Sequence, residues 1–160
     1  MIIYALIPLR TGSVRIKNKN FVKVKKKPVY FHAVNQTLKS KLIRKVFIAT
    51  KSKKIKIKHK KLSIFKRSKK SNTKKSSTEI VIEEFLRSNF CDYLVLIQAT
   101  NLFIKTKYID LAINKIINNR KKYDSLLSVV KSKYLIWQRN KDIIISKNYN
   151  YKKRPRSQDI

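Results

Sequence analysis

The amino-acid sequence predicts an α/β protein in which a mostly parallel sheet is flanked by helices. Three observations favour this class. Short apolar runs alternate along the chain with segments of helical periodicity, an order that is typical of parallel sheets. Residues 2–7 form a continuous apolar run, as expected for a strand that is buried on both faces. The 160 residues are 42% hydrophobic, which is enough to fill one core.

The first half of the chain predicts two strands and one helix. The strand at residues 2–7 is followed by a polar, basic loop over residues 9–20. A helix is expected from Pro28 to about Ser40, because proline is favoured where a helix begins and apolar side chains then recur at helical spacing. The second strand is expected at residues 45–50, KVFIAT.

The second half begins with a lysine-dense segment, residues 51–75, whose apolar piece LSIF at residues 62–65 predicts a third strand. SSTE at residues 76–79 matches a helix capping box. In such a box Ser76 would cap the helix, and Ser76 and Glu79 would satisfy each other's backbone donors. A helix is therefore expected from this point.

A fourth strand and a last helix follow. YLVLIQ at residues 93–98 predicts the strand. A stripe of apolar residues at helical spacing predicts the helix after it. The side chains expected to be buried are Ile80, Val81, Ile82, Phe85 and Leu86 in the first of these helices and Ile109, Ala112, Ile113, Ile116 and Ile117 in the second.

The order of these elements also predicts where a ligand would bind. In open parallel sheets, ligands bind beyond the carboxyl ends of the strands. Three polar segments directly follow predicted strands, so we expect them at one edge of the sheet: residues 10–20, 50–52 and 98–101.

The charge of the chain is extreme and has two explanations. The 41 Lys and Arg residues and 8 Asp and Glu residues give a formal net charge of +33. One explanation is a surface that binds nucleic acid or another polyanion. The other is compositional drift, which enriches Lys, Ile, Asn, Tyr and Phe together and depletes Gly and Pro. We favour drift because lysines occur in every segment, so nonspecific polyanion binding is a secondary expectation.

The remaining composition predicts a cytoplasmic protein without a membrane segment. Cys91 is the only cysteine, so an internal disulfide is excluded. His32 and His59 do not have the spacing of zinc ligands. The apolar runs are too short to cross a membrane, and the first of them lacks the basic leader of a signal peptide.

The loop IPLRTGSVRIKNKN, residues 7–20, contains the only glycine of the chain, Gly12. A basic loop with one glycine lets the backbone approach a ligand closely, so it can hold phosphates. It lacks the two glycines of a Walker A loop and the three of a dinucleotide fingerprint. A solvated basic loop without a ligand is the alternative.

Five stretches of the chain resemble, in order, the acylneuraminate cytidylyltransferase family, also called CMP-N-acetylneuraminic acid synthetases. They are IPLRTGSVRIKNKN, KKKPVYFHAVNQTLKSKLIRKVFIAT, LVLIQATNLF, YDSLLSVVKSKYLIW and KKRPRSQDI. The resemblance implies a Rossmann-like nucleotide-diphospho-sugar transferase fold of the GT-A-like type. It also implies that CTP and a sialic-type sugar acid give the CMP-sugar and pyrophosphate. The sugar acid itself stays open, with KDO, pseudaminic acid and legionaminic acid as other candidates.

The resemblance assigns roles to individual residues. Arg10 and Lys19 fall on catalytic positions. The positions that the family uses to bind the nucleotide correspond to Arg10, Gly12, Ser13, Arg15, Lys19, Asn20, Arg67, Ser77 and Gln98. Gly12 then lies where the loop passes closest to phosphate. An inactive remnant or a polyanion-binding module that keeps the nucleotide fold is the alternative function.

The chain departs from the family pattern in its carboxylates. The family uses Mg²⁺, which prefers carboxylate and phosphate oxygens. Lys51 and Thr73 stand where the family has aspartates, and no Asp-x-Asp pair is present. Glu83 and Glu84 are adjacent on a predicted helix, so their side chains diverge and we expect a solvated face. The sequence therefore predicts no metal site.

The resemblance also sets the expected organisation. It runs over nearly the whole chain and stops where the family continues through its late magnesium-binding aspartates. We therefore expect one partial domain over residues 1–160, with a variable lysine-rich segment at 51–75. Residues 131–160 would begin the arm through which the family dimerises, so a homodimer is expected only if the rest of that arm is supplied.

Overall fold

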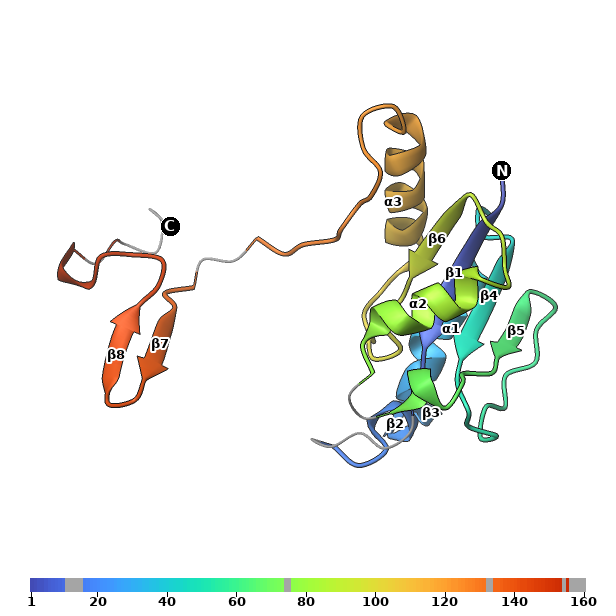
Figure 1. Ribbon diagram of the computed structural model, residues 1–160, viewed down its shortest axis with the longest axis horizontal. Helices are drawn as coiled ribbons and strands as arrows, with labels where there is room; N and C mark the ends of the chain where they lie inside the picture. Colours follow the sequence, from blue (N-terminus) through green and yellow to red (C-terminus); the bar gives the residue numbers. More distant parts are fainter. Residues whose placement is uncertain (11–15, 74–75, 132–133, 154, 156–160) are drawn as a thin grey trace. The chain divides into compact units, whose positions relative to one another are not determined.

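The computed structural model describes residues 1–10, 16–73, 76–131, 134–153 and 155. The chain forms two compact units, Met1–Leu126 and Leu127–Ile160. The first contains the sheet and the long helices, and the second contains a hairpin (Figure 1). Among the described residues, no helix is both long enough and apolar enough to cross a membrane.

The first unit is built on a four-stranded sheet whose strands are all parallel, in the order β5-β4-β1-β6. β1 (Ile3–Pro8) lies at the centre, next to β4 (Lys45–Ala49), and β5 (Leu62–Phe65) lies beyond β4. β6 (Tyr93–Leu96) pairs with the other side of β1. All four predicted strands are thus present, and the predicted parallel sheet is confirmed.

Helices cover both faces of this sheet. α1 (Val29–Leu38) and α3 (Thr106–Asn118) pack against one face, and α2 (Thr78–Leu86) packs against the other (Figure 1). Successive side chains of a strand point to opposite faces, so Ala5 belongs to the core under α1 and α3, whereas Leu6 belongs to the core under α2. Both are fully buried, as the apolar first strand predicted.

The core under α2 is aromatic and is centred on Phe85. This side chain is fully buried. Its ring lies 4.8 Å from the ring of Phe47 and 5.3 Å from that of Phe65, both at steep angles. Edge-to-face pairs at these distances add to the stabilisation that comes from removing apolar area from water. The core therefore fixes α2 against β4 and β5.

The predicted capping box is wrong. α2 begins one residue later than that box requires, with Ser77 as its N-cap and without a hydrogen bond from the cap side chain. The Ser76 hydroxyl donates instead to the carbonyl of Lys70 at 2.6 Å and accepts from the backbone N–H of Thr73 at 3.1 Å. These two bonds tie Ser76 to the chain around the short 3-10 helix Lys70–Asn72, so its hydroxyl is not available to cap α2.

Two small hairpins were not predicted from the sequence. β2 (Lys23–Val24) and β3 (Lys27–Pro28) are joined by Lys25 and Lys26, with φ of 48° and 64°. Such φ values normally attract Gly or Asn, so two lysines carry no turn signal. In the second unit, β7 (Trp137–Asn140) pairs with β8 (Ile143–Ser146) across a turn in which Lys141 has φ of 52°.

The lysine-rich segment is ordered by its few apolar residues. Ile55 and Ile57 are partly buried and pack against the core, while Lys54, Lys56 and Lys58 are exposed. In an extended chain alternate side chains point in opposite directions. The segment therefore presents lysines to solvent from one side and isoleucines to the core from the other.

Candidate nucleotide site

A pocket of about 260 Å³ lies at the carboxyl ends of β1, β5 and β6. Arg10 follows β1, Arg67 follows β5 and Gln98 follows β6, and all three line it. Residues from the amino end of α2 complete the described wall. The pocket therefore occupies the place in a parallel sheet where ligands bind.

Six of the nine residues singled out as nucleotide ligands line this one pocket: Arg10, Lys19, Asn20, Arg67, Ser77 and Gln98. They come from positions up to 88 residues apart in the chain (10 to 98). The other three, Gly12, Ser13 and Arg15, lie outside the described residues. Thr50 follows β4 at the same edge, but residues 50–52 are not among the described lining residues.

Asn20 has a buried acceptor at this pocket. The residue is only 4% exposed. Its Nδ2 donates to the backbone carbonyl of Arg10 at 3.1 Å, which ties the short 3-10 helix Lys19–Phe21 to the end of β1. Its Oδ1 has no hydrogen-bond partner among the described residues. Leaving a buried acceptor unpaired costs about 1–3 kcal/mol, so a ligand that donates a hydrogen bond here would relieve that cost.

Arg67 brings a buried positive charge to the pocket. It is 4% exposed, and one of its terminal nitrogens donates to the carbonyl of Ser71, while Nε has no partner in the described part of the chain. Burial lowers the pKa of Arg67, Glu84 opposes this shift, and the positive charge of Arg10 lowers the pKa further. The guanidinium groups of Arg67 and Arg10 therefore repel one another, and an anion bound between them would reduce this repulsion.

The amino end of α2 adds backbone donors. Ser76, Ser77 and Thr78 all line the pocket, and the first N–H groups of a helix have no intrahelical partner. The helix dipole places partial positive charge at the same end. At this helix end the pKa of the exposed Glu79 carboxylate is lowered. The larger cause is a hydrogen bond from the backbone, and the smaller cause is a hydrogen bond from the Ser77 side chain.

The sequence did not predict a role for Glu84, because Glu83 and Glu84 were expected together on a solvated face. Glu83 is exposed, but Glu84 is half-buried and its Oε1 accepts from the backbone N–H of Ser68 at 2.7 Å. Burial alone would raise the pKa of Glu84. Hydrogen bonds from Ser71 and Ser68 and the charge of Arg67 outweigh burial and lower it. Glu84 follows Val81 by three residues, and this spacing on one helix face was the available signal.

The described residues do not supply a metal centre of the usual kind. They contain no group of three or more His, Cys, Asp or Glu side chains that could hold an ion. No carboxylate is among the described residues that line the nucleotide pocket. The acidic residue behind its wall, Glu84, is already engaged by Ser68.

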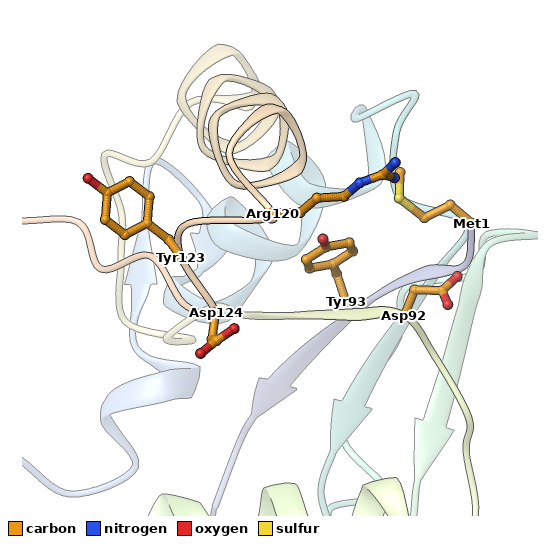
Figure 2. A pocket seen from close by; sticks show the side chains of 6 residues that line it. All are labelled: Met1, Asp92, Tyr93, Arg120, Tyr123 and Asp124. Carbon is orange, nitrogen blue, oxygen red and sulfur yellow. The ribbon is translucent and has the colours of Figure 1, made fainter.

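A second cavity of about 490 Å³ lies at the opposite edge of the sheet. It is lined by Met1, Asp92, Tyr93, Arg120, Tyr123 and Asp124, and it contains none of the predicted nucleotide ligands. Figure 2 shows Arg120 extended toward Met1, with Tyr123 pointing away from both. The Asp92 carboxylate accepts from the backbone N–H of Ile2 and thereby holds the start of β1.

The parallel sheet, the helices on both faces and the cationic pocket at the carboxyl ends define a nucleotidyltransferase-like α/β domain. Comparison with protein-family models specifies it further: residues 4–160 match the model described as cytidylyltransferase. The chain belongs to the cytidylyltransferase family. The finer prediction of an acylneuraminate enzyme stays a prediction.

Solved structures show the same fold at low sequence identity. A CMP:2-keto-3-deoxy-manno-octonic acid synthetase complexed with CTP is 17% identical, with a TM-score of 0.60 over 75% of this chain and 49% of that one. The Francisella tularensis 2-C-methyl-D-erythritol 4-phosphate cytidylyltransferase is 16% identical, with a TM-score of 0.65 over 94% of this chain and 67% of that one.

A cytidylyltransferase from Leptospira borgpetersenii serovar Hardjo-bovis is 17% identical, with a TM-score of 0.55 over 75% of this chain and 50% of that one. The chain thus spans about half the length of two of these three structures. A search of curated proteins gave no match.

Proposed function

We propose that this chain binds CTP and that it serves the transfer of CMP to a sugar acid. The observation that carries the proposal is the gathering of Arg10, Lys19, Asn20, Arg67, Ser77 and Gln98 around one pocket. Membership of the cytidylyltransferase family supports CTP as the nucleotide. The solved synthetase that carries CTP and shares this fold is consistent with it.

The groups at the pocket match the parts of a nucleoside triphosphate. Arg10, Lys19 and Arg67 supply positive charge for the phosphates, and the amino end of α2 supplies N–H donors. The buried Oδ1 of Asn20 accepts from a hydroxyl or amino group of the nucleoside. Gln98 is exposed at the end of β6 and can both donate and accept, which suits the junction between nucleotide and sugar.

In the proposed reaction a sugar hydroxyl attacks the α-phosphate of CTP, and pyrophosphate leaves. Negative charge spreads over the phosphate oxygens, so catalysis consists mainly of positioning and charge stabilisation. We assign these tasks to Arg10 and Lys19. Magnesium is expected for the family, but the described carboxylates do not fit a magnesium site at this pocket, so we derive no step through the ion.

The sugar acid is proposed to be of the sialic type. This assignment rests on the sequence resemblance of the stretches LVLIQATNLF and KKRPRSQDI to the acylneuraminate branch. The structural comparisons include an octonic acid synthetase and a methylerythritol phosphate enzyme, so they support the cytidylyltransferase class without selecting the sugar. A homodimer is part of the same proposal only on the condition that residues 131–160 are joined by the rest of the family's dimerisation arm.

Thermal unfolding with and without nucleotide tests the proposed CTP site. A ligand that binds only the folded state stabilises it by mass action, by about 2.7 kcal/mol at a hundredfold excess over Kd. We expect CTP to raise Tm more than ATP, GTP or inorganic triphosphate at equal concentration, and Arg10→Ala to remove most of that increase. Equal shifts with all four anions, unchanged in the variant, would show that only net charge is at work.

One observation favours a second candidate, binding of a nucleic-acid backbone. Lys54, Lys56 and Lys58 are exposed on one side of a segment whose isoleucines pack inward. Such a row of cations is arranged to neutralise successive phosphates. Neither function excludes the other, because the row lies outside the described lining of the pocket.

A further inference from the structure

Glu84 lies behind the wall of the nucleotide pocket and has no part in the proposed chemistry. α2 places it three residues after Val81, which lines the pocket. Its Oε1 accepts the backbone N–H of Ser68 at 2.7 Å. Because Ser68 directly follows Arg67, this hydrogen bond joins α2 to the segment that carries the buried guanidinium.

That segment, residues 67–71, is a turn closed by its own hydrogen bonds. The Arg67 guanidinium donates to the carbonyl of Ser71. The backbone N–H of Ser71 donates to the Ser68 hydroxyl at 3.2 Å, and the two hydroxyls lie 3.4 Å apart. Ser71 is fully buried. The hydrogen bonds of Arg67, Ser68 and Ser71 stay within the turn, whereas the bond from Ser68 to the Glu84 carboxylate joins the turn to α2.

The charges around Arg67 require compensation. Arg67 is 4% exposed and experiences the positive charge of Arg10, and both conditions oppose a buried cation. Glu84 acts in the opposite direction on the same guanidinium. An arginine does not lose its proton under ordinary conditions, so without the carboxylate it would have to move away from Arg10 or toward water.

We propose that Glu84 is a positioning residue of the nucleotide site: it anchors the turn 67–71 to α2 and holds the Arg67 guanidinium beside Arg10, ready for a phosphate chain. The inference rests on the proposed function for the identity of the nucleotide. The central claim, that Glu84 places Arg67 to bind phosphate, does not depend on the cytosine base.

A simple charge argument predicts the opposite effect. A carboxylate near a phosphate site repels the ligand, so neutralising it would tighten binding if Glu84 acted only through its charge. If Glu84 acts by holding Arg67, neutralising it weakens binding. Glu84→Gln keeps an oxygen that can accept from Ser68 and removes the charge. Glu83→Gln is the matched control, because this neighbouring glutamate is exposed and carries the same charge.

The experiment is calorimetric titration of CTP and of inorganic triphosphate into the wild-type chain and four variants at physiological ionic strength. The variants are Glu84→Gln, Glu83→Gln, Arg67→Ala and the Arg67→Ala, Glu84→Gln double variant. We expect about tenfold weaker binding for Glu84→Gln, the scale of one charge-assisted hydrogen bond, and no weakening for Glu83→Gln. We expect the double variant to bind no more weakly than Arg67→Ala.

Two results would overturn the positioning role. One is that Glu84→Gln binds triphosphate as tightly as the wild type or more tightly. The other is that the effects of the two substitutions add, because Glu84 would then act independently of Arg67. If Glu84→Gln does not fold by circular dichroism, Glu84→Asp replaces it: the shorter side chain keeps the charge, loses its reach to Ser68, and should show the same weakening.

The two anions separate this inference from the proposed function. If the wild type binds CTP no more tightly than inorganic triphosphate, the CTP function fails, and the positioning role is decided by the triphosphate titrations alone. If CTP binds specifically and Glu84→Gln has no effect, the function stands and the positioning role fails. If the wild type binds neither anion, both are wrong.

Discussion

Phe85→Ala provides a quantitative test of how the core supports the pocket. Phe85 is fully buried and makes edge-to-face contacts with Phe47 at 4.8 Å and Phe65 at 5.3 Å. Truncating a buried phenylalanine costs about 3–5 kcal/mol in total, and the two lost aromatic pairs, each worth about 0.5–1.5 kcal/mol of that total, place this change toward the upper end of the range. Since domains are stable by only about 5–15 kcal/mol, this change removes a large part of the free energy of unfolding.

The assay is urea denaturation followed by circular dichroism. The matched control is Phe90→Ala, because Phe90 is the same residue type shortly after the same helix but is 77% exposed. We expect a change within about 0.5 kcal/mol for the control. A loss below about 1 kcal/mol for Phe85→Ala, at an unchanged slope m, would refute the argument that this ring fixes α2. Phe85→Leu gives a smaller loss in the same direction if the alanine variant does not fold.

Three further outcomes are expected. The pKa of Glu84 is lowered in the folded state, so its carboxylate stabilises the fold above its ordinary pKa, and this stabilisation is lost as pH falls through the folded-state pKa. The free energies of unfolding of the wild type and of Glu84→Gln should therefore differ at pH 7 and converge in acid. A difference that stays constant with pH would refute this. Burial raises the pKa of the Cys91 thiol, so at pH 8 it should react with a disulfide reagent more slowly than the urea-unfolded chain, and equal rates would contradict it. Glutamine at Lys54, Lys56 and Lys58 should lower DNA affinity more than glutamine at three exposed lysines in and next to α3, Lys105, Lys107 and Lys115, which removes the same charge, and should reduce the salt dependence more; equal losses would show that net charge is the only cause.

The sequence determined the sheet and the edge at which the pocket lies. Residues 2–7 form a continuous apolar run, and a strand of that kind is typical of a parallel sheet covered by helices on both faces. The periodic stripe with Ile109 and Ile113 likewise identified α3, because burying one helix face requires that spacing. Since parallel strands bring their carboxyl ends to one edge, this order alone predicted that Arg10 and Gln98 would lie together.

The tertiary structure decided the partners of the polar groups. Ser76 bonds to Lys70 and Thr73 instead of capping α2, and Glu84 turns toward Ser68 and Arg67 while Glu83 faces solvent. The hairpin through Lys25 and Lys26 carried no turn residues. Apolar periodicity records which face of an element is buried, because burial depends mainly on area. It does not record which distant donor or acceptor a side chain meets, because hydrogen bonds and ion pairs depend on positions that exist only after the chain has folded.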